Sequence, residues 1–221
     1  MARPLRLVVY DQTDVAPLSL PRIERASDGT AHGTGGLSRW WRVGAAMHRG
    51  VLRADGTRGV SSFAEALEWA TSIARQRGAK LGELQVWGHG GWGQMTLGRT
   101  RLDRDALARS SEISAALDAL RDVLADDALL WLRCCSAFGE REGRAFGAAL
   151  ADRVRARVAG HTFIIGVFQS GTHSIAPGQE PTWDPEEGIE RGAAGLACAM
   201  TSTPKAPNTI GCLRLGFPGG W

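Results

Sequence analysis

The chain has 221 residues, enough for one large α/β domain or two small ones with a substantial hydrophobic core. Its 26 basic and 23 acidic residues give a net charge of +3, and the basic residues are scattered, so we expect no nucleic-acid partner. We also expect no secretory leader and no membrane span, since no apolar run approaches the roughly 20 residues that a span needs. Four cysteines do not form the framework of a small secreted protein, so the composition predicts a reducing, cytoplasmic location.

Strand and helix patterns alternate along the chain. Apolar runs predict strands at residues 5–10, 84–87, 129–132 and 162–168, and helical spacing predicts helices at 38–48, 63–73, 113–124 and 146–158. Ser62 and Glu65 form a capping-box pattern at the start of the second helix. Such alternation predicts an α/β fold with a mostly parallel sheet covered on both faces, in a single domain over residues 1–221.

The remaining segments are predicted from turn signals. A Pro- and Gly-rich loop extends to Gly36, the dipeptide at 55–56 is a hairpin signal, and a small hairpin is expected at 95–102. Residues 170–191 contain three prolines and read as a long, mobile substrate-binding or regulatory loop. Residues 209–215 alternate like an edge strand. The one local density of basic residues, Arg153, Arg155 and Arg157, is expected near a helix C-terminus, where cations complement the helix dipole.

Two apolar runs end on residues that nucleophilic catalysis uses. The run from Leu84 leads into Gly88 and His89, and the run from Leu129 leads into Cys134 and Cys135. Ligands of open α/β sheets bind at the carboxyl ends of the strands, and a thiolate nucleophile requires a cysteine beside a histidine. A helix starting near Glu140 would favour the thiolate form of Cys135 through its N-terminal dipole. The sequence therefore predicts a cysteine-dependent hydrolase.

Other uses of these residues are less favoured. Zinc sites normally show ligand pairs at short spacings, which adjacent cysteines do not provide, so no metal and no other cofactor is expected. The glycines at 33–36 follow no apolar strand and lack a Gly-Lys-Ser/Thr ending, so they do not predict a phosphate loop. His173, in the 170–191 segment, is an alternative catalytic base.

The motif GHGGWG at 88–93, with a hairpin after it, and the motif LWLRCC at 130–135 resemble the histidine and cysteine blocks of the caspase-like cysteine peptidases. This superfamily contains the caspases, metacaspases, gingipains and bacterial relatives. The histidine precedes the cysteine, and their separation, 135 − 89 = 46, fits the roughly 50 residues found in caspases. The resemblance covers about residues 5–168. Residues 133–137 read RCCSA where caspases have Gln-Ala-Cys-x-Gly, so the resemblance is to the wider superfamily, bacterial type.

The resemblance implies a caspase-like three-layer sandwich and a cysteine endopeptidase that cuts a protein or peptide substrate. Cys135 is then the nucleophile, His89 the general base and acid, and the amides of Gly90 and Cys135 form the oxyanion hole. Strand alternation also favours Cys135 over Cys134, because Trp131, Arg133 and Cys135 share a face. Many bacterial relatives belong to larger regulatory systems, so a protein partner that activates the domain or is cut by it is expected.

The resemblance also places the pocket for the residue before the cut. Its expected substrate-binding residues are Asp11 or Asp14, then Arg133, then the segment containing Ser170. Arg133 would favour an acidic substrate residue through a charge-assisted contact, whereas the carboxylates favour a basic one. Because carboxylates outnumber the guanidinium, and Asp11 is a candidate to neutralise Arg133, the sequence favours a basic residue.

Two alternatives remain open. One is a catalytically silent caspase-like interaction module, and the other is a cysteine hydrolase that does not act on peptides. Rapid alkylation of Cys135 near neutral pH would indicate an activated thiolate.

Overall fold

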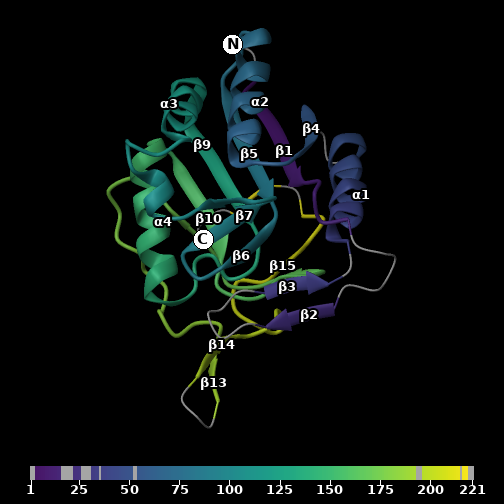
Figure 1. Ribbon diagram of the computed structural model, residues 1–221, viewed down its shortest axis with the longest axis vertical. Helices are drawn as coiled ribbons and strands as arrows, with labels where there is room; N and C mark the ends of the chain where they lie inside the picture. The colour runs from purple at the N-terminus through teal and green to yellow at the C-terminus, as the bar shows by residue number, and fades with distance from the viewer. Residues whose placement is uncertain are drawn as a thin grey trace.

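A computed structural model describes residues 3–15, 36–51, 54–192, 196–214 and 216–218, and the backbone of residues 22–25 and 31–34. Its centre is a six-stranded sheet in the order β12-β10-β9-β5-β1-β4 (Figure 1). Neighbouring strands are parallel except for β12, which pairs antiparallel with β10 at one edge. The strands are β1 (Leu5–Asp11), β4 (Gly56–Val60), β5 (Leu81–Trp87), β9 (Leu124–Arg133), β10 (Arg157–His161) and β12 (Thr172–Ile175).

Helices cover both faces of this sheet. They are α1 (Leu37–Gly50), α2 (Phe63–Gln76), α3 (Ser114–Val123) and α4 (Glu140–Val154). Alternate side chains of β1 show the two sides: Leu7 and Val9 belong to the large core with α2, α3 and α4, while Val8 packs with α1. Figure 1 shows α2, α3 and α4 in front of the sheet and α1 beside β4. The predicted α/β class and the mostly parallel sheet are therefore confirmed.

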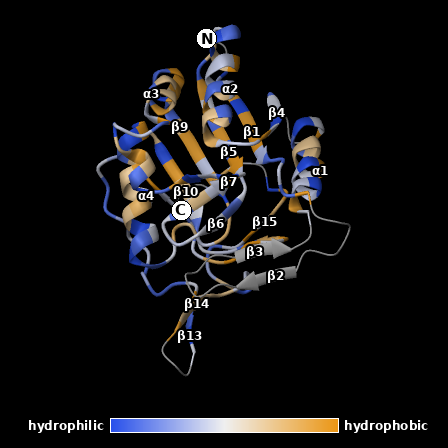
Figure 2. Ribbon diagram, viewed as in Figure 1, coloured by the Kyte–Doolittle hydropathy of each residue, from blue (hydrophilic) through white to orange (hydrophobic). Residues whose placement is uncertain are grey.

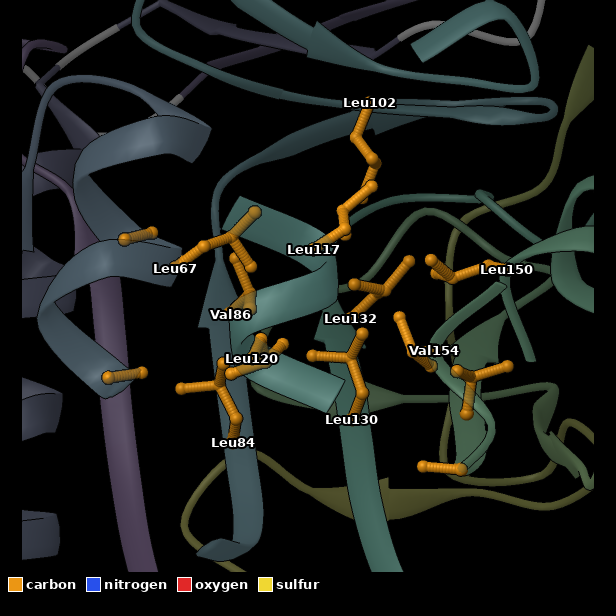
Figure 3. Packing of buried hydrophobic residues seen from close by; sticks show 14 of the residues in the cluster. Leu67, Leu84, Val86, Leu102, Leu117, Leu120, Leu130, Leu132, Leu150 and Val154 are labelled. Carbon is orange, nitrogen blue, oxygen red and sulfur yellow. The ribbon is translucent and has the colours of Figure 1, made fainter. Parts of the chain in front are cut away.

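The large core is aliphatic and lies between the central sheet and the three helices. Figure 3 shows Leu84, Val86, Leu130 and Leu132 from β5 and β9 meeting helical side chains such as Leu117. Figure 2 shows the same distribution, with hydrophobic residues on the inner sides of the helices and along the strands. Close packing of this kind fixes the ends of β5 and β9 side by side, and the predicted catalytic residues follow those ends.

A second, five-stranded antiparallel sheet lies at the carboxyl end of the central strands. Its order is β2-β3-β6-β7-β8, from β2 (Arg22–Arg25), β3 (Ala31–Thr34), β6 (His89–Gly91), β7 (Gln94–Leu97) and β8 (Thr100–Leu102). The hairpin expected at 95–102 is confirmed as β7 and β8. The segment predicted as a loop up to Gly36 instead contains β2 and β3, and β3 pairs with β6 next to His89. Residues 16–21, 26–30 and 35 of that segment lie outside the described residues.

The cap predicted at the start of α2 is confirmed at Ser62, but the reciprocal bond of Glu65 reaches the amide of the preceding residue and not the N-cap amide of a capping box. The Glu65 amide donates to the Ser62 hydroxyl at 3.2 Å, and the Glu65 carboxylate accepts from the Ser61 amide at 2.8 Å. The hairpin predicted from the dipeptide at 55–56 is wrong, because β4 runs parallel to β1. Asp55 stands at the beginning of β4, where its carboxylate accepts from the Arg6 amide and from Arg3.

The boundary between the last helix and the next strand also differs from the prediction. Arg155 adopts a left-handed conformation with φ of 52°, so α4 ends at Val154 and the strand covers 157–161 instead of 162–168. Val158 therefore lies in β10 and not in the helix. The spacing of Val154 and Val158 fits a helix, but buried strands are equally apolar, so periodicity could not separate the two elements.

The segment 170–191 is less irregular than predicted. Its beginning is β12, an edge strand of the central sheet, and its end, β13 (Ile189–Arg191), pairs with β14 (Ala197–Ala199). Trp183 is buried and stacks between Phe138 and His173. The edge strand predicted at 209–215 is reduced to β15 (Ile210–Gly211), paired with β11 (Phe168–Gln169) outside the central sheet. Leu215 lies outside the described residues.

Candidate active site

His89 begins β6, two residues after β5 ends. Its Nε2 lies 3.1 Å from the Oδ2 of Asp14, and the Trp41 ring of α1 meets the imidazole edge-on with centroids 5.2 Å apart. A carboxylate only accepts hydrogen bonds, so Nε2 carries the proton in this pair. In the neutral ring, the Nδ1 lone pair is then the one that can accept a proton.

Asp14 was predicted as a substrate-binding residue, and the structure gives it a different contact. Besides His89, its carboxylate accepts from the Leu37 amide at 3.1 Å, at the first turn of α1. The carboxylate thus links the loop after β1, the start of α1 and the imidazole. This is the arrangement in which a third group orients a catalytic base. No local sequence pattern indicates this pairing, because 75 positions separate the two residues.

The adjacent cysteines at the end of β9 occupy different environments. Cys134 is buried in the large core with Leu130 and Leu132, and burial raises the pKa of its thiol well above the ordinary value. Cys135 is partly exposed and packs in a small apolar cluster with Trp92, Ile164 and Ala199, which we call the cysteine cluster. The prediction that Cys134 packs in the core is therefore confirmed, and the catalytic role of Cys135 stays a prediction.

Gly90 brings the histidine and cysteine blocks together. A methyl group added at Gly90 would collide with the Cys135 carbonyl oxygen and lie 2.7 Å from the Cys134 Sγ. Only glycine allows this close approach of the two backbones. Gly90 pairs with Ala31 of β3 and Met95 of β7, so it lies inside the second sheet. The roles of the Gly90 and Cys135 amides in an oxyanion hole remain predictions.

The thiol of Cys135 is protonated in this conformation. Burial raises its pKa to about 11, although the Ile165 carbonyl, 3.9 Å from Sγ, acts in the opposite direction. The predicted helix is present and α4 begins at Glu140, after a tight turn in which the Gly139 amide donates to the Ser136 carbonyl. The cost of desolvating a thiolate among apolar side chains outweighs any gain from that helix.

We expect the alkylation rate of Cys135 by iodoacetamide to rise about tenfold for each pH unit between 8 and 10, because only the thiolate reacts. With a pKa raised to about 11, the thiolate fraction keeps growing until the pH reaches that value. Mass spectrometry of the peptide containing both cysteines would follow the reaction. Buried Cys134 should stay unmodified in the folded protein, and a Cys135 rate that levels off near neutral pH would contradict the expectation.

Arg133, the last residue of β9, is almost fully buried and holds no carboxylate among the described residues. Its guanidinium lies over the rings of Trp87 and Trp131, 5.2 and 4.7 Å from their centroids. It donates to Gln85 Oε1, Gln169 Oε1 and the Cys212 carbonyl at 2.6 to 3.0 Å. Burial lowers its pKa to about 10, so the group remains charged at neutral pH. The predicted neutralisation by Asp11 is wrong.

Asp11 and Ser170, the other predicted substrate-binding residues, have structural contacts instead. The buried Asp11 carboxylate accepts from the amide and hydroxyl of Thr13 and from the Gly98 amide, at 2.7 to 2.8 Å. Ser170 is fully buried, and its hydroxyl bonds the Thr203 carbonyl and the Thr209 hydroxyl. Neither side chain is available to a substrate in this conformation.

Sequence reasoning missed the glutamines that hold Arg133. Gln85 and Trp87 alternate on β5 and lie in register with Trp131 and Arg133 of β9, so strand pairing alone could have suggested Gln85. Gln85 also bonds Glu83 at 2.6 Å, and Glu83 pairs with Arg6 at 2.8 Å. Gln169 comes from β11, 36 positions later, and no local pattern pointed to it. His173, the alternative catalytic base, has a partner of its own: its Nε2 lies 2.7 Å from Glu187 Oε1.

The structure thus defines an α/β protein with a histidine and a cysteine after adjacent parallel strands. Residues 49–173 match the family described as a domain of unknown function (DUF4347), so the chain belongs to that family. No curated protein and no solved structure matches the chain.

Two properties of the described residues concern metal binding and membranes. No three His, Cys, Asp or Glu side chains in them lie close enough together to hold a metal ion. No helix in the same part of the chain is long and apolar enough to cross a membrane.

Proposed function

We propose that this chain is a caspase-like cysteine endopeptidase in which Cys135 is the nucleophile and His89 the general base. The observation that carries the proposal is the contact at Gly90, where the backbone after His89 lies against the Cys135 carbonyl. The pairing of β5 with β9 and the Asp14 carboxylate on His89 support it further. Cysteine, histidine and an orienting carboxylate together form the set that acyl transfer uses.

The reaction follows from these positions. The Cys135 Sγ attacks the carbonyl carbon of the scissile peptide bond, and its proton passes to His89 Nδ1. The Asp14 carboxylate stabilises the imidazolium that forms, and backbone amides at Gly90 and Cys135 bind the developing oxyanion. His89 then protonates the leaving amine, which departs as the C–N bond breaks. Water, deprotonated by His89, hydrolyses the thioester and releases the acid product.

The described conformation fits a resting form of such an enzyme. Ala199 packs in the cysteine cluster, and its segment is held by two backbone bonds of 2.8 Å, from the Ile164 amide to Met200 and from the Ser202 amide to Ile164. Moving this segment would make the partly exposed Cys135 more accessible to water and to substrate, which lowers the cost of forming the thiolate. We propose that substrate or an activating protein partner makes this change.

The contacts of Arg133 bear on the residue before the cut. The acceptors of the buried Arg133 guanidinium among the described residues are all neutral oxygens, so a substrate carboxylate would add an opposite charge and two oxygens that match the planar fork of arginine. Asp11 and Asp14, which favoured a basic residue, are engaged with Thr13 and His89. We therefore propose an acidic residue at this position, with the Cys212 carbonyl giving way to it.

Cleavage of a peptide library, read by mass spectrometry, tests both proposals. The wild-type protein should produce new termini that the Cys135→Ala protein does not produce, with an excess of Asp or Glu before the cut. Identical peptide profiles for the two proteins would refute the proposal that the chain is an endopeptidase. Cuts after Arg or Lys would support the endopeptidase proposal but refute the proposed role of Arg133 in binding an acidic residue.

A second candidate function is a catalytically silent caspase-like interaction module. The observation that favours it is the protonated Cys135, whose thiol pKa burial raises to about 11. A silent module would give no cleavage in the library, and it would gain no thiol reactivity when its substrate-like peptides are added.

Substituting Asp14 by Asn tests the orienting role of the carboxylate. We expect kcat to fall by about 10²-fold or more with little change in KM, because an amide can hold the wrong tautomer and cannot stabilise the imidazolium. Steady-state kinetics on a library-derived peptide would measure it. The thermal melting temperature is the control, since Asn can still accept from the Leu37 amide. An unchanged kcat would contradict the role.

A further inference from the structure

A cavity of about 560 Å³ lies away from the candidate active site, between α3, α4 and the short 3₁₀ helix η1 (Asp105–Leu107). Figure 1 shows α3 and α4 next to each other on the same face of the sheet, and η1 contacts α4. The cavity lies at the C-terminal end of α4, whereas Cys135 precedes the N-terminal end. A helix of 15 residues separates these ends by roughly 22 Å.

Arginines from three separate chain segments line this cavity. Apolar atoms of Leu107, Ala108 and Ala149 complete its wall, together with Asp152. The arginines are Arg104, Arg109, Arg121, Arg153 and Arg155. Their convergence is a property of the fold, because the sequence showed only the cluster at 153–157 and explained it by a helix end.

The positive charge at the cavity is only partly neutralised. Asp118 pairs with Arg121 at 2.9 Å and with Arg153 at 2.7 Å. Asp122 also pairs with Arg121, at 3.3 Å. In the described part of the chain, the guanidinium groups of Arg104, Arg109 and Arg155 form no ion pair. Asp118 and Asp122 are thus engaged with these arginines, and Asp152, which lines the cavity, accepts from the Gly178 amide.

Arg153 is the most buried of the paired arginines at this cavity and is held in a fixed position. Its side chain is only 10% exposed, and its terminal nitrogens bond Asp118 and Ser114. Its Nε is buried and has no hydrogen-bond partner among the described residues. A buried donor without an acceptor is costly, so Arg153 keeps a full positive charge beside the cavity at some expense in stability.

We propose that this arginine cavity binds a small soluble anion that carries several phosphate groups. The planar fork of arginine matches the paired oxygens of phosphate, and several arginines around one cavity suit a ligand with several such groups. The volume lies within the range of small-molecule sites, roughly 300–1,000 Å³. The partly apolar wall and the enclosed Arg153 favour a compact ligand over an extended acidic peptide.

Isothermal titration calorimetry with inorganic tripolyphosphate and the full chain tests the proposal. We expect saturable binding that weakens with added salt, as screening requires. The double substitution Arg104→Gln and Arg109→Gln should weaken it about tenfold or more, since two charge-assisted contacts are lost. Both side chains are exposed, so the fold should persist. The control, Arg49→Gln with Arg75→Gln, removes the same charge from exposed positions on α1 and α2 and should bind like the wild type.

Three results would overturn the proposal. The first is the absence of tripolyphosphate binding at low salt, and the second is equal weakening by the two double substitutions, which would indicate a general charge effect. The third comes from a parallel arm with poly-glutamate and with phosphatidylcholine vesicles containing phosphatidylinositol bisphosphate. Binding to either of these without binding to tripolyphosphate would assign the cavity to an acidic peptide or to a lipid surface.

Discussion

The Cys135→Ala and His89→Ala substitutions should each reduce kcat/KM for peptide hydrolysis by about 10³-fold or more. The thiol supplies the bond-forming sulfur and the imidazole moves its proton, so neither loss can be compensated by a neighbour. Because the two act as one unit, the double substitution should cost little more than either single one. Steady-state kinetics on a peptide from the library screen, with circular dichroism to verify folding, would measure these effects.

Cys134→Ala is the matched control for this experiment. Cys134 lies in the large core, so its truncation should lower stability but leave kcat/KM near the wild-type value. An inactive Cys134→Ala protein with an active Cys135→Ala protein would show that the roles of the two cysteines are exchanged.

Gly90→Ala should lower kcat/KM by about 10²-fold, the loss expected when reacting groups are displaced by roughly 1 Å. The added methyl group meets the Cys135 carbonyl and Cys134, so either β6 or the turn after β9 must shift. Such overpacking should also lower the free energy of unfolding by about 1–3 kcal/mol. Kinetics and urea unfolding on the same preparation would give both values.

Gly166→Ala provides the control for the added methyl group. Gly166 adjoins Ile165, whose carbonyl contacts Cys135, but a methyl group there has no heavy atom within 4 Å. Its kinetics and stability should match the wild type. If Gly90→Ala behaves in the same way, the close approach of the two blocks has no part in activity.

The fold was predictable where local pattern and tertiary position agree. The apolar runs that became β1, β5 and β9 and the stripes that became α2 and α3 are buried in the large core, so composition and period pointed to the same element. Hydrophobic pattern did not predict the strands whose pairing partners come from distant segments of the chain. The pairing of β3 with β6, and of β11 with β15, depends on contacts between short strands that have no period of their own.

The candidate site shows the same division. His89 and Cys135 were predictable because each follows an apolar strand, and strand ends are where such sheets place functional groups. The contacts that decide the roles of Asp14 and Arg133 could not be predicted, since they join residues 75 and 36 positions apart. Burial of the Cys135 thiol also depends on Ala199, a residue far along the chain from the cysteine block.

The central claim, that Cys135 is the nucleophile of a peptidase, is tested most directly by covalent trapping. Peptidyl acyloxymethyl ketones with Asp or Arg before the reactive group would be incubated with the wild-type and His89→Ala proteins, and the modified residue identified by tandem mass spectrometry. We predict a single adduct on Cys135 in the wild-type protein, faster with the Asp probe, and no comparable labelling without His89. Labelling of Cys134, Cys198 or Cys212 in place of Cys135, or equal labelling of Cys135 with and without His89, would contradict the claim.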